Sequence, residues 1–425
     1  MNYQNSLEFA RQQDEQDELR SYREKFYIPV INGKETIYFT GNSLGLQPKS
    51  TKDYINVELE DWAKWGVEGH FNGRNPWFAY HEMFAEPIAK IVGALPKEVV
   101  VMNNLTVNLN LLLVSFYRPT PTRYKILCEA KAFPSDQYAL EMQVRNAGLN
   151  PDEAIIEIAP REGEKIIRHE DIISAIEEAG DSLACVMIGG VNYFTGQVFD
   201  MKAITAAAHK VGANCGFDLA HGAGNIELKL HEWDIDFACW CSYKYLNSGP
   251  GGVSGAFIHE RHCDNTELPR FAGWWGHDKD SRFLMEKGFH PMKSAEAWQM
   301  SNAPILTMAA HKASVDIFEE VGMEKLLKKQ KALSGYLEFI VDDINSSLNT
   351  PNTSLEIITP RNWKERGCQV SVIAHGYGKD LFNELTNEGV ISDWREPNAI
   401  RMAPVPLYNS FEDVYRFGEI LKKAM

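Results

Sequence analysis

Short apolar runs alternate with amphipathic segments along the middle of this chain, from about residue 85 to 260. The apolar runs predict strands at 99–102, 125–128, 154–158, 183–188, 214–218, 237–241 and 253–258. Helical patterns precede or separate most of them, at 86–92, 107–117, 136–145, 169–178 and 201–211. Short apolar strands separated by helices are typical of an α/β domain with a mostly parallel sheet that helices cover on both faces.

From residue 305 the pattern changes to longer helices mixed with short strands. Helical patterns run through 320 and over 323–345, 380–387 and 411–423, and strand-like runs occupy 355–358, 369–374 and 399–403. We therefore predict a large α/β domain over residues 46–303 and a smaller C-terminal α+β domain over 304–425. The N-terminal segment, 1–45, is expected to pack on the small domain or on a partner subunit.

Composition narrows the class of protein. The 425 residues are 44% hydrophobic and 24% charged, with a net charge of -15 and no run of Lys and Arg, which argues against nucleic-acid or anionic-membrane partners. The longest apolar run, 109–116, is too short to span a bilayer, and the acidic N-terminus does not resemble a signal peptide. The seven cysteines form neither a disulfide framework nor a metal-binding pattern, and we expect reduced core thiols in a cytoplasmic protein without a bound metal.

An aspartate and a lysine stand at the ends of two predicted strands. Asp218 ends the run at 214–218, and Lys244 follows the run at 237–241, with Gly249, Gly251 and Gly252 behind it. Taken alone, each has an ordinary interpretation as a cap or surface residue. Pyridoxal phosphate (PLP) requires both groups, because its aldehyde forms a Schiff base with an amine and its ring nitrogen pairs with a carboxylate.

Neighbouring residues could complete such a site. Asn104 or Thr106 can lie at the N-terminus of the helix at 107–117, where backbone N–H groups bind a phosphate, or can simply cap that helix. Phe133 could stack on a cofactor ring or lie in the core, and His221 could orient Asp218 or bond a backbone carbonyl. Neither a G-x-G-x-x-G run nor a P-loop occurs, which disfavours dinucleotides and nucleoside triphosphates.

Several motifs together resemble those of kynureninases, PLP-dependent hydrolases of fold type I, the aspartate aminotransferase-like superfamily. The matching stretches are FTGNSLGLQP at 39–48, FPSD at 133–136, GFDLAH at 216–221, CWCSYKYLN at 239–247, GWWGH at 273–277, SN at 301–302 and RMAPVPLYNS at 401–410. They extend over nearly the whole chain.

This resemblance implies a role for each matched residue. Lys244 would hold PLP as a Schiff base and move protons, Asp218 would pair with the ring nitrogen beside His221, Phe133 would stack on the ring, and Asp136 would help to hold it. The phosphate would be surrounded by the Leu105 backbone, Thr106, Tyr243, Trp274 and Asn302, some of them from the second subunit of a homodimer. Tyr243 would also relay protons.

The substrate would be bound by other residues that the resemblance marks. Arg401 would clamp the substrate carboxylate, and Ser43, His70 and Asn302 would line the aryl pocket. Many relatives carry Ser or Thr where this chain has Gly189, which cannot supply their hydroxyl contact to the cofactor.

The implied reaction is hydrolytic cleavage of the Cβ–Cγ bond of L-kynurenine, and of 3-hydroxykynurenine, to anthranilate or 3-hydroxyanthranilate and L-alanine, in tryptophan catabolism and NAD biosynthesis. A class V aminotransferase shares the lysine, the aspartate and the carboxylate clamp, and stays an alternative. A cysteine desulfurase needs a nucleophilic cysteine on a mobile loop. No cysteine lies between Cys263 and Cys368, and Cys368 adjoins a predicted strand. A non-catalytic PLP-binding protein is the third alternative.

Overall fold

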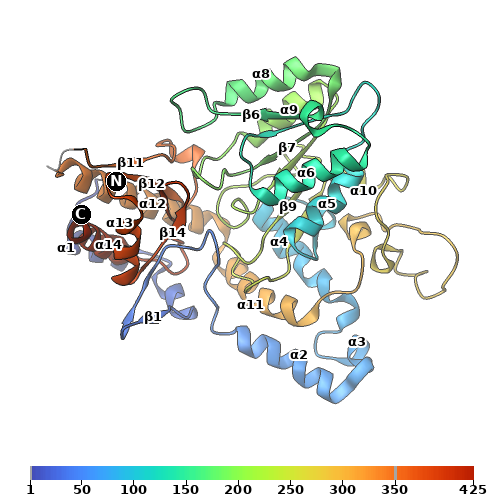
Figure 1. Cartoon of the computed structure of the whole chain (residues 1–425). Coiled ribbons are helices and arrows are strands. Elements are labelled where there is room, and N and C mark those ends of the chain that lie inside the picture. Colours follow the sequence, from blue (N-terminus) through green and yellow to red (C-terminus); the bar gives the residue numbers. More distant parts are fainter. Residues whose placement is uncertain (1, 349–351) are drawn as a thin grey trace. The chain divides into compact units, whose positions relative to one another are not determined.

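The computed structural model describes residues 2–348 and 352–425, which divide into two compact units (Figure 1). The larger unit holds residues 51–191 and 199–319, and the smaller holds the described residues of 1–50, 192–198 and 320–425. The domain boundaries predicted after residues 45 and 303 stay a prediction. No helix in the described part of the chain is long and apolar enough to cross a membrane.

The larger unit is built on a seven-stranded sheet in the order β4-β10-β9-β8-β7-β5-β6. Its strands are β4 (Val99–Val101), β5 (Lys125–Glu129), β6 (Ile155–Ile158), β7 (Leu183–Gly189), β8 (Asn214–Asp218), β9 (Phe237–Trp240) and β10 (Gly255–Ile258). The five strands from β6 to β9 in this order are parallel, and β10 is antiparallel to both of its neighbours. The mostly parallel sheet predicted from the sequence is confirmed. β10 departs from it because a loop without a crossover helix joins it to β9.

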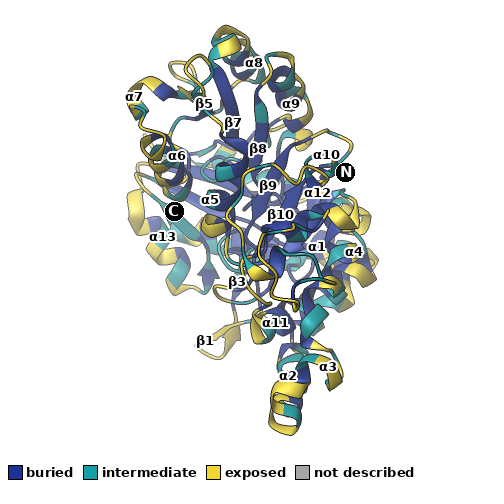
Figure 2. Cartoon of the chain, turned by 90° about the vertical axis from the view of Figure 1, so that its right-hand side faces the viewer, coloured by how far each residue is buried: buried dark blue, intermediate teal, exposed yellow. Residues whose placement is uncertain are grey.

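Helices lie on both faces of this sheet. The helices of the larger unit are α2 (Thr51–Trp65), α3 (Gly69–Asn72), α4 (Ala85–Val92), α5 (Leu105–Phe116), α6 (Pro134–Asn146), α7 (Pro151–Ala154), α8 (His169–Ala179), α9 (Met201–Lys210), α10 (Glu260–Cys263) and most of α11 (Ile305–Val321), of which α2 and α3 project away from the sheet (Figure 1). Figure 1 shows α8 and α9 on one side of β7, and α5 and α6 on the other. Side chains of α5 and α6 form one apolar cluster with Cys185, Met187 and Cys239 of the sheet. The central strands are accordingly buried (Figure 2). Because both faces are covered, the edge where the parallel strands end is the natural place for a ligand.

The smaller unit contains a four-stranded antiparallel sheet in the order β11-β12-β15-β14. These strands are β11 (Ser354–Ile357), β12 (Val370–His375), β14 (Asp393–Arg395) and β15 (Ala399–Met402). The N-terminal segment supplies α1 (Leu7–Gln16), the hairpin of β1 (Val30–Ile31) and β2 (Lys34–Glu35), and β3 (Ile37–Tyr38), which pairs in parallel with β13 (Val390–Ile391). The remaining helices are α12 (Met323–Ser346), α13 (Gly378–Asn387) and α14 (Phe411–Ala424).

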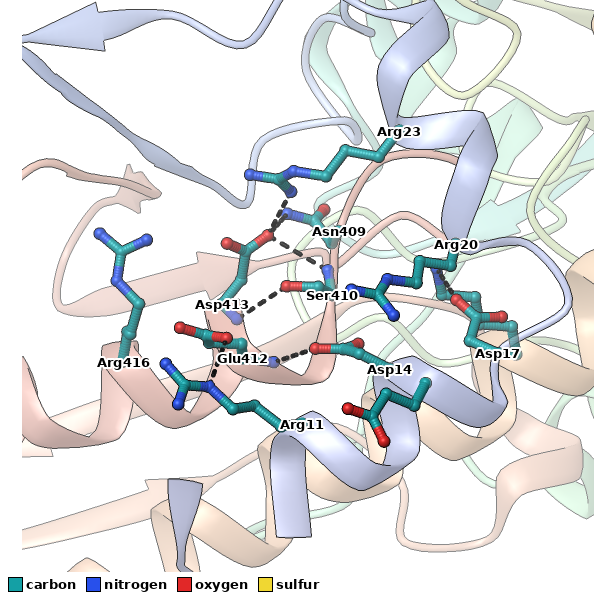
Figure 3. A pocket seen from close by; sticks show the side chains of 12 residues that line it. Arg11, Asp14, Asp17, Arg20, Arg23, Asn409, Ser410, Glu412, Asp413 and Arg416 are labelled. Atoms are coloured by element: carbon teal, nitrogen blue, oxygen red, sulfur yellow. Dashed lines mark hydrogen bonds and ion pairs between the residues drawn. The ribbon is translucent and has the colours of Figure 1, made fainter. Parts of the chain in front are cut away.

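A pocket rich in charged side chains lies where α1 meets the start of α14 (Figure 3). The carboxylate of Asp14 accepts hydrogen bonds from the N–H groups of Phe411 (2.7 Å) and Glu412 (2.9 Å). Asp413 in the same turn pairs with Arg23 at 2.7 Å. Asp14 therefore supplies the negative charge that the N-terminus of α14 attracts, and helps to fasten the N-terminal segment to this unit.

Candidate functional site

Asp218 lies at the carboxyl end of β8, in the middle of the parallel part of the sheet. It is 7% exposed, and its Oδ1 accepts a hydrogen bond from the N–H of Ala220 at 2.6 Å. Burial raises the pKa of Asp218, while the positive charge of Lys244 and the N–H of Ala220 lower it. A buried carboxylate is stable when a cation lies nearby. Lys244 is such a cation, and the pyridinium of PLP would be a second one.

Lys244 lies in the turn that follows β9, the strand next to β8. Its carbonyl oxygen accepts a hydrogen bond from Asn247 (3.1 Å), and Ser248 donates to the carbonyl of Ser242 (3.1 Å). These bonds hold the lysine in a tight turn. Its Nζ lies 5.9 Å from the centre of the Phe133 ring. The strand order thus brings together a lysine, a carboxylate and an aromatic ring that are far apart in the sequence.

The FPSD stretch begins α6 and points two of the predicted residues toward this edge. Phe133 is the residue before the helix, and Pro134 occupies the first helical position, where its fixed backbone angle favours helix initiation. Asp136 follows in the first turn and is buried. Burial and the charge of Asp218 raise the pKa of Asp136 well above its usual range, and the two carboxyl groups share a hydrogen bond. Asp136 therefore keeps its proton and donates a hydrogen bond to Asp218.

The N-terminus of α5 is the candidate phosphate site. Asn104 caps the helix, because its side chain accepts from the N–H of Val107 at 3.1 Å. Asn104 is thus the residue that caps the helix, and the phosphate role of this helix start stays a prediction. Leu105 is buried, and Thr106 is exposed in the first turn. The N–H groups at this helix start and the Thr106 hydroxyl are the donors that a phosphate requires.

His221 and Tyr243 lie close to the same edge. The buried ring of His221 packs edge-on against Tyr245, with ring centres 6.3 Å apart. Tyr243 is half-buried directly before Lys244, and burial together with a hydrogen bond to Cys241 raises the pKa of its hydroxyl. A phenol that keeps its proton at neutral pH can donate it to a phosphate or a substrate.

Trp274 and Asn302 are exposed to solvent in the larger unit. Trp274 is 48% exposed, and its ring N–H donates to the carbonyl of Arg282 at 3.1 Å. The Oδ1 of Asn302 accepts from Ser301 at 3.0 Å. Their predicted role as phosphate ligands stays a prediction.

His70, a predicted residue of the aryl pocket, lies in α3 of the larger unit. Its Nδ1 lies 2.9 Å from the carbonyl oxygen of Val67, and its ring packs edge-on against Trp77. Within the described ranges, no contact connects it with Lys244. Its predicted role stays a prediction.

Arg401 and Ser43, the other predicted substrate residues, meet within the smaller unit. Arg401 on β15 is 1% exposed, donates to the carbonyl of Tyr193 (2.6 Å) and forms a close ion pair with Asp393. Ser43 donates to the same carboxylate at 2.6 Å. Asp393 lies directly opposite Arg401 in the β14–β15 pairing. Asp393 was not among the residues predicted from the sequence. Because a buried guanidinium requires a carboxylate partner, a partner such as Asp393 could have been expected had Arg401 been predicted to be buried.

Glu129 was also missed. It is the last residue of β5 and is 3% exposed, and its carboxylate accepts a hydrogen bond from the N–H of Gly189 on β7. An acidic residue that ends an apolar strand was the available signal.

Comparisons with known proteins show which family this chain resembles. The family model "Kynureninase C-terminal domain" matches residues 326–421. A kynureninase from Flavobacterium psychrophilum is 60% identical, covering 100% of this chain and 99% of the relative. One from Mus musculus is 47% identical, covering 97% and 92%.

Solved structures with the same fold are more distant in sequence. A cysteine desulfurase from Thermococcus onnurineus has a TM-score of 0.75 at 20% identity, covering 95% of this chain and 97% of that one. A cystine C–S lyase has a TM-score of 0.73 at 14% identity, covering 91% and 97%. These likenesses define the fold, which is that of fold type I PLP enzymes. The similarity to the kynureninases extends over full length, and the chain belongs to the kynureninase family.

Proposed function

We propose that this chain hydrolyses the Cβ–Cγ bond of L-kynurenine, releasing anthranilate and L-alanine, at a PLP bound through Lys244. The observation that carries the site assignment is the buried Asp218 beside Asp136 at the carboxyl edge of the sheet, with Lys244 and Phe133 next to it. PLP, when bound, supplies an electron sink for the bonds at the substrate α-carbon. The pathway roles in tryptophan catabolism and NAD biosynthesis follow from this reaction.

The buried carboxyl pair favours a protonated ring nitrogen. Asp218 carries the negative charge and Asp136 holds a proton, so the pair presents one net charge to one cation. Lys244 would hold the aldehyde carbon and, once substrate has released its amine, would take the proton from the α-carbon. Phe133, whose ring lies near Lys244, would cover the cofactor ring, and His221 would support the turn after Asp218.

The phosphate is assigned to the start of α5. Leu105 contributes its N–H, Thr106 its N–H and hydroxyl, and Tyr243 its phenol. Because the pKa of Tyr243 is raised, the phenol stays protonated and can pass a proton between the phosphate and the substrate.

The substrate carboxylate is assigned to Arg401, whose planar guanidinium binds carboxylates with two parallel hydrogen bonds. Its bonds to Tyr193 and Asp393 fix the plane of the guanidinium before substrate arrives. Ser43 shares Asp393 with it, which supports the placement of Ser43 beside the substrate. His70 and Asn302 are proposed to border the aryl ring, and 3-hydroxykynurenine is proposed as a second substrate.

A cytoplasmic homodimer completes the proposal. Trp274 and Asn302 are exposed, as expected for residues that serve the phosphate site of a second subunit. All seven cysteines are free and buried, which suits a reducing compartment.

Incubation of the PLP-loaded protein with kynurenine in the absence of a keto acid tests the proposal. We expect anthranilate fluorescence to rise through many turnovers. Lys244→Ala should lose both this signal and the visible absorption band of the bound cofactor. A wild-type protein that needs a keto acid to turn over would support the aminotransferase alternative. One that shows no cofactor band after PLP addition would contradict the site assignment.

A further inference from the structure

Three neighbouring strands end side by side at the carboxyl edge of the large sheet, and the middle one ends in a glycine. β5, β7 and β8 end at Glu129, Gly189 and Asp218, and Gly189 lies opposite Asp218 in the strand pairing. The carboxyl group of Glu129 takes the space that a side chain at position 189 would use. Its two oxygens lie 3.2 and 3.1 Å from the N–H of Gly189, and a Cβ there would stand 2.9 Å from Oε1. The missing side chain therefore leaves room for a carboxyl group beside Asp218.

Glu129 is buried, and the charge of Asp218 acts on it. Three titratable side chains interact electrostatically with Glu129 or with the two aspartates near it. They are Asp218 on β8, Asp136 on α6 and Lys244 after β9. The positive charge of Lys244 acts on the two aspartates. Burial, followed by the charge of Asp218, raises the pKa of Glu129 to about 7, against the hydrogen bond from Gly189. Near neutral pH, the Glu129 carboxyl group is therefore neutral in some molecules and charged in the others.

We propose that Glu129 is a positioning residue of the cofactor site, which acts through Asp218 and sets how tightly the PLP on Lys244 holds its protons. A charged Glu129 adds a negative potential at the site and favours the protonated cofactor, whereas a neutral Glu129 removes that potential. The carboxyl group touches neither substrate nor cofactor in this assignment. The proposal rests on the proposed function, because it takes the cofactor to be PLP bound at Lys244.

The test is a spectroscopic pH titration of the holoenzyme without substrate. The visible absorption band of the Schiff base changes when its proton is lost, so the midpoint pH reports the proton affinity of the cofactor. We expect Glu129→Gln to lower this midpoint, with a change in proton affinity on the order of tenfold for a charge removed from a partly desolvated site. Glu129→Asp, which restores a carboxyl group, should return the midpoint part of the way to the wild-type value.

Glu157 offers a matched control, because it is an exposed carboxylate on β6, the strand beside β5. Glu157→Gln removes the same charge outside the buried cluster and should leave the midpoint unchanged. A wild-type midpoint in Glu129→Gln would overturn the proposal. Equal shifts in both glutamine variants would overturn it as well, since they would report only the net charge of the protein.

Gly189→Ala provides a second test if Glu129→Gln does not fold. It keeps every carboxyl group, but its Cβ approaches Oε1 and displaces the Glu129 carboxyl. We expect a shifted midpoint, and an unchanged one would contradict the proposal. Failure of the proposed function is distinguishable, because the wild-type protein would then have no Schiff-base band or would keep it in Lys244→Ala.

Discussion

Replacing Glu129 by glutamine should remove a pH-dependent loss of stability that the wild-type protein shows when it is freed of cofactor. Burial raises the pKa of this carboxyl group from its ordinary 4.5 to about 7. Between these values the folded state holds a proton that the unfolded state has lost. The stabilisation is therefore complete below pH 4.5 and disappears as the pH rises through 7. At about 1.4 kcal/mol for each pH unit, the free energy of unfolding falls by about 3 kcal/mol over this interval.

Urea unfolding of the cofactor-free wild type and of Glu129→Gln, at several pH values from 5 to 8, measures this difference. Glutamine does not titrate, so the variant should gain stability relative to wild type as the pH rises, by about 3 kcal/mol in total. Other buried carboxyl groups such as Asp14 are present in both proteins and cancel in the difference. Glu157→Gln serves as the control and should track the wild type. A difference between Glu129→Gln and wild type that stays constant with pH would refute the reasoning.

Two further predictions concern the substrate clamp. Arg401→Ala should lower kcat/KM for kynurenine by a factor of roughly 10 to 100, mainly through KM, because a charge-assisted hydrogen bond contributes about 1.5–3 kcal/mol; steady-state kinetics with an unchanged KM would remove the clamp role. Asp393→Ala leaves the buried Arg401 without its carboxylate and should destabilise the protein by about 3 kcal/mol. A thermal melt that coincides with that of the wild type would show that the ion pair contributes nothing to stability.

Residues with local sequence signals could be predicted from the sequence. Asp218 and Lys244 directly follow apolar runs, and Pro134 marks the start of the helix that carries Asp136. In each case the sequence feature lies within a few residues of the side chain whose position it predicts. The α/β alternation likewise predicted the mostly parallel sheet, since buried parallel strands are apolar along their whole length.

Contacts that depend on the order of the strands could not be predicted from local sequence signals. Glu129 meets Gly189 because β5 pairs with β7, and these strands are separated by α6, α7, β6 and α8 in the chain. Asp393 meets Arg401 only through the register of β14 against β15. Local propensity does not encode a partner on another strand, so the contacts of these two carboxylates became visible only in the folded chain. The choice between Asn104 and Thr106 as helix cap depended on one hydrogen bond in the same way.

The central claim is that Lys244 carries the cofactor, and chemical trapping tests it most directly. Borohydride reduction of the holoenzyme fixes a Schiff base as a stable amine, and mass spectrometry of the digested protein then locates the modified lysine. We predict a single pyridoxyl-phosphate adduct, on the peptide that contains Lys244, in a preparation that releases anthranilate from kynurenine before reduction. An adduct on a different lysine, or an active preparation without an adduct, would contradict the account.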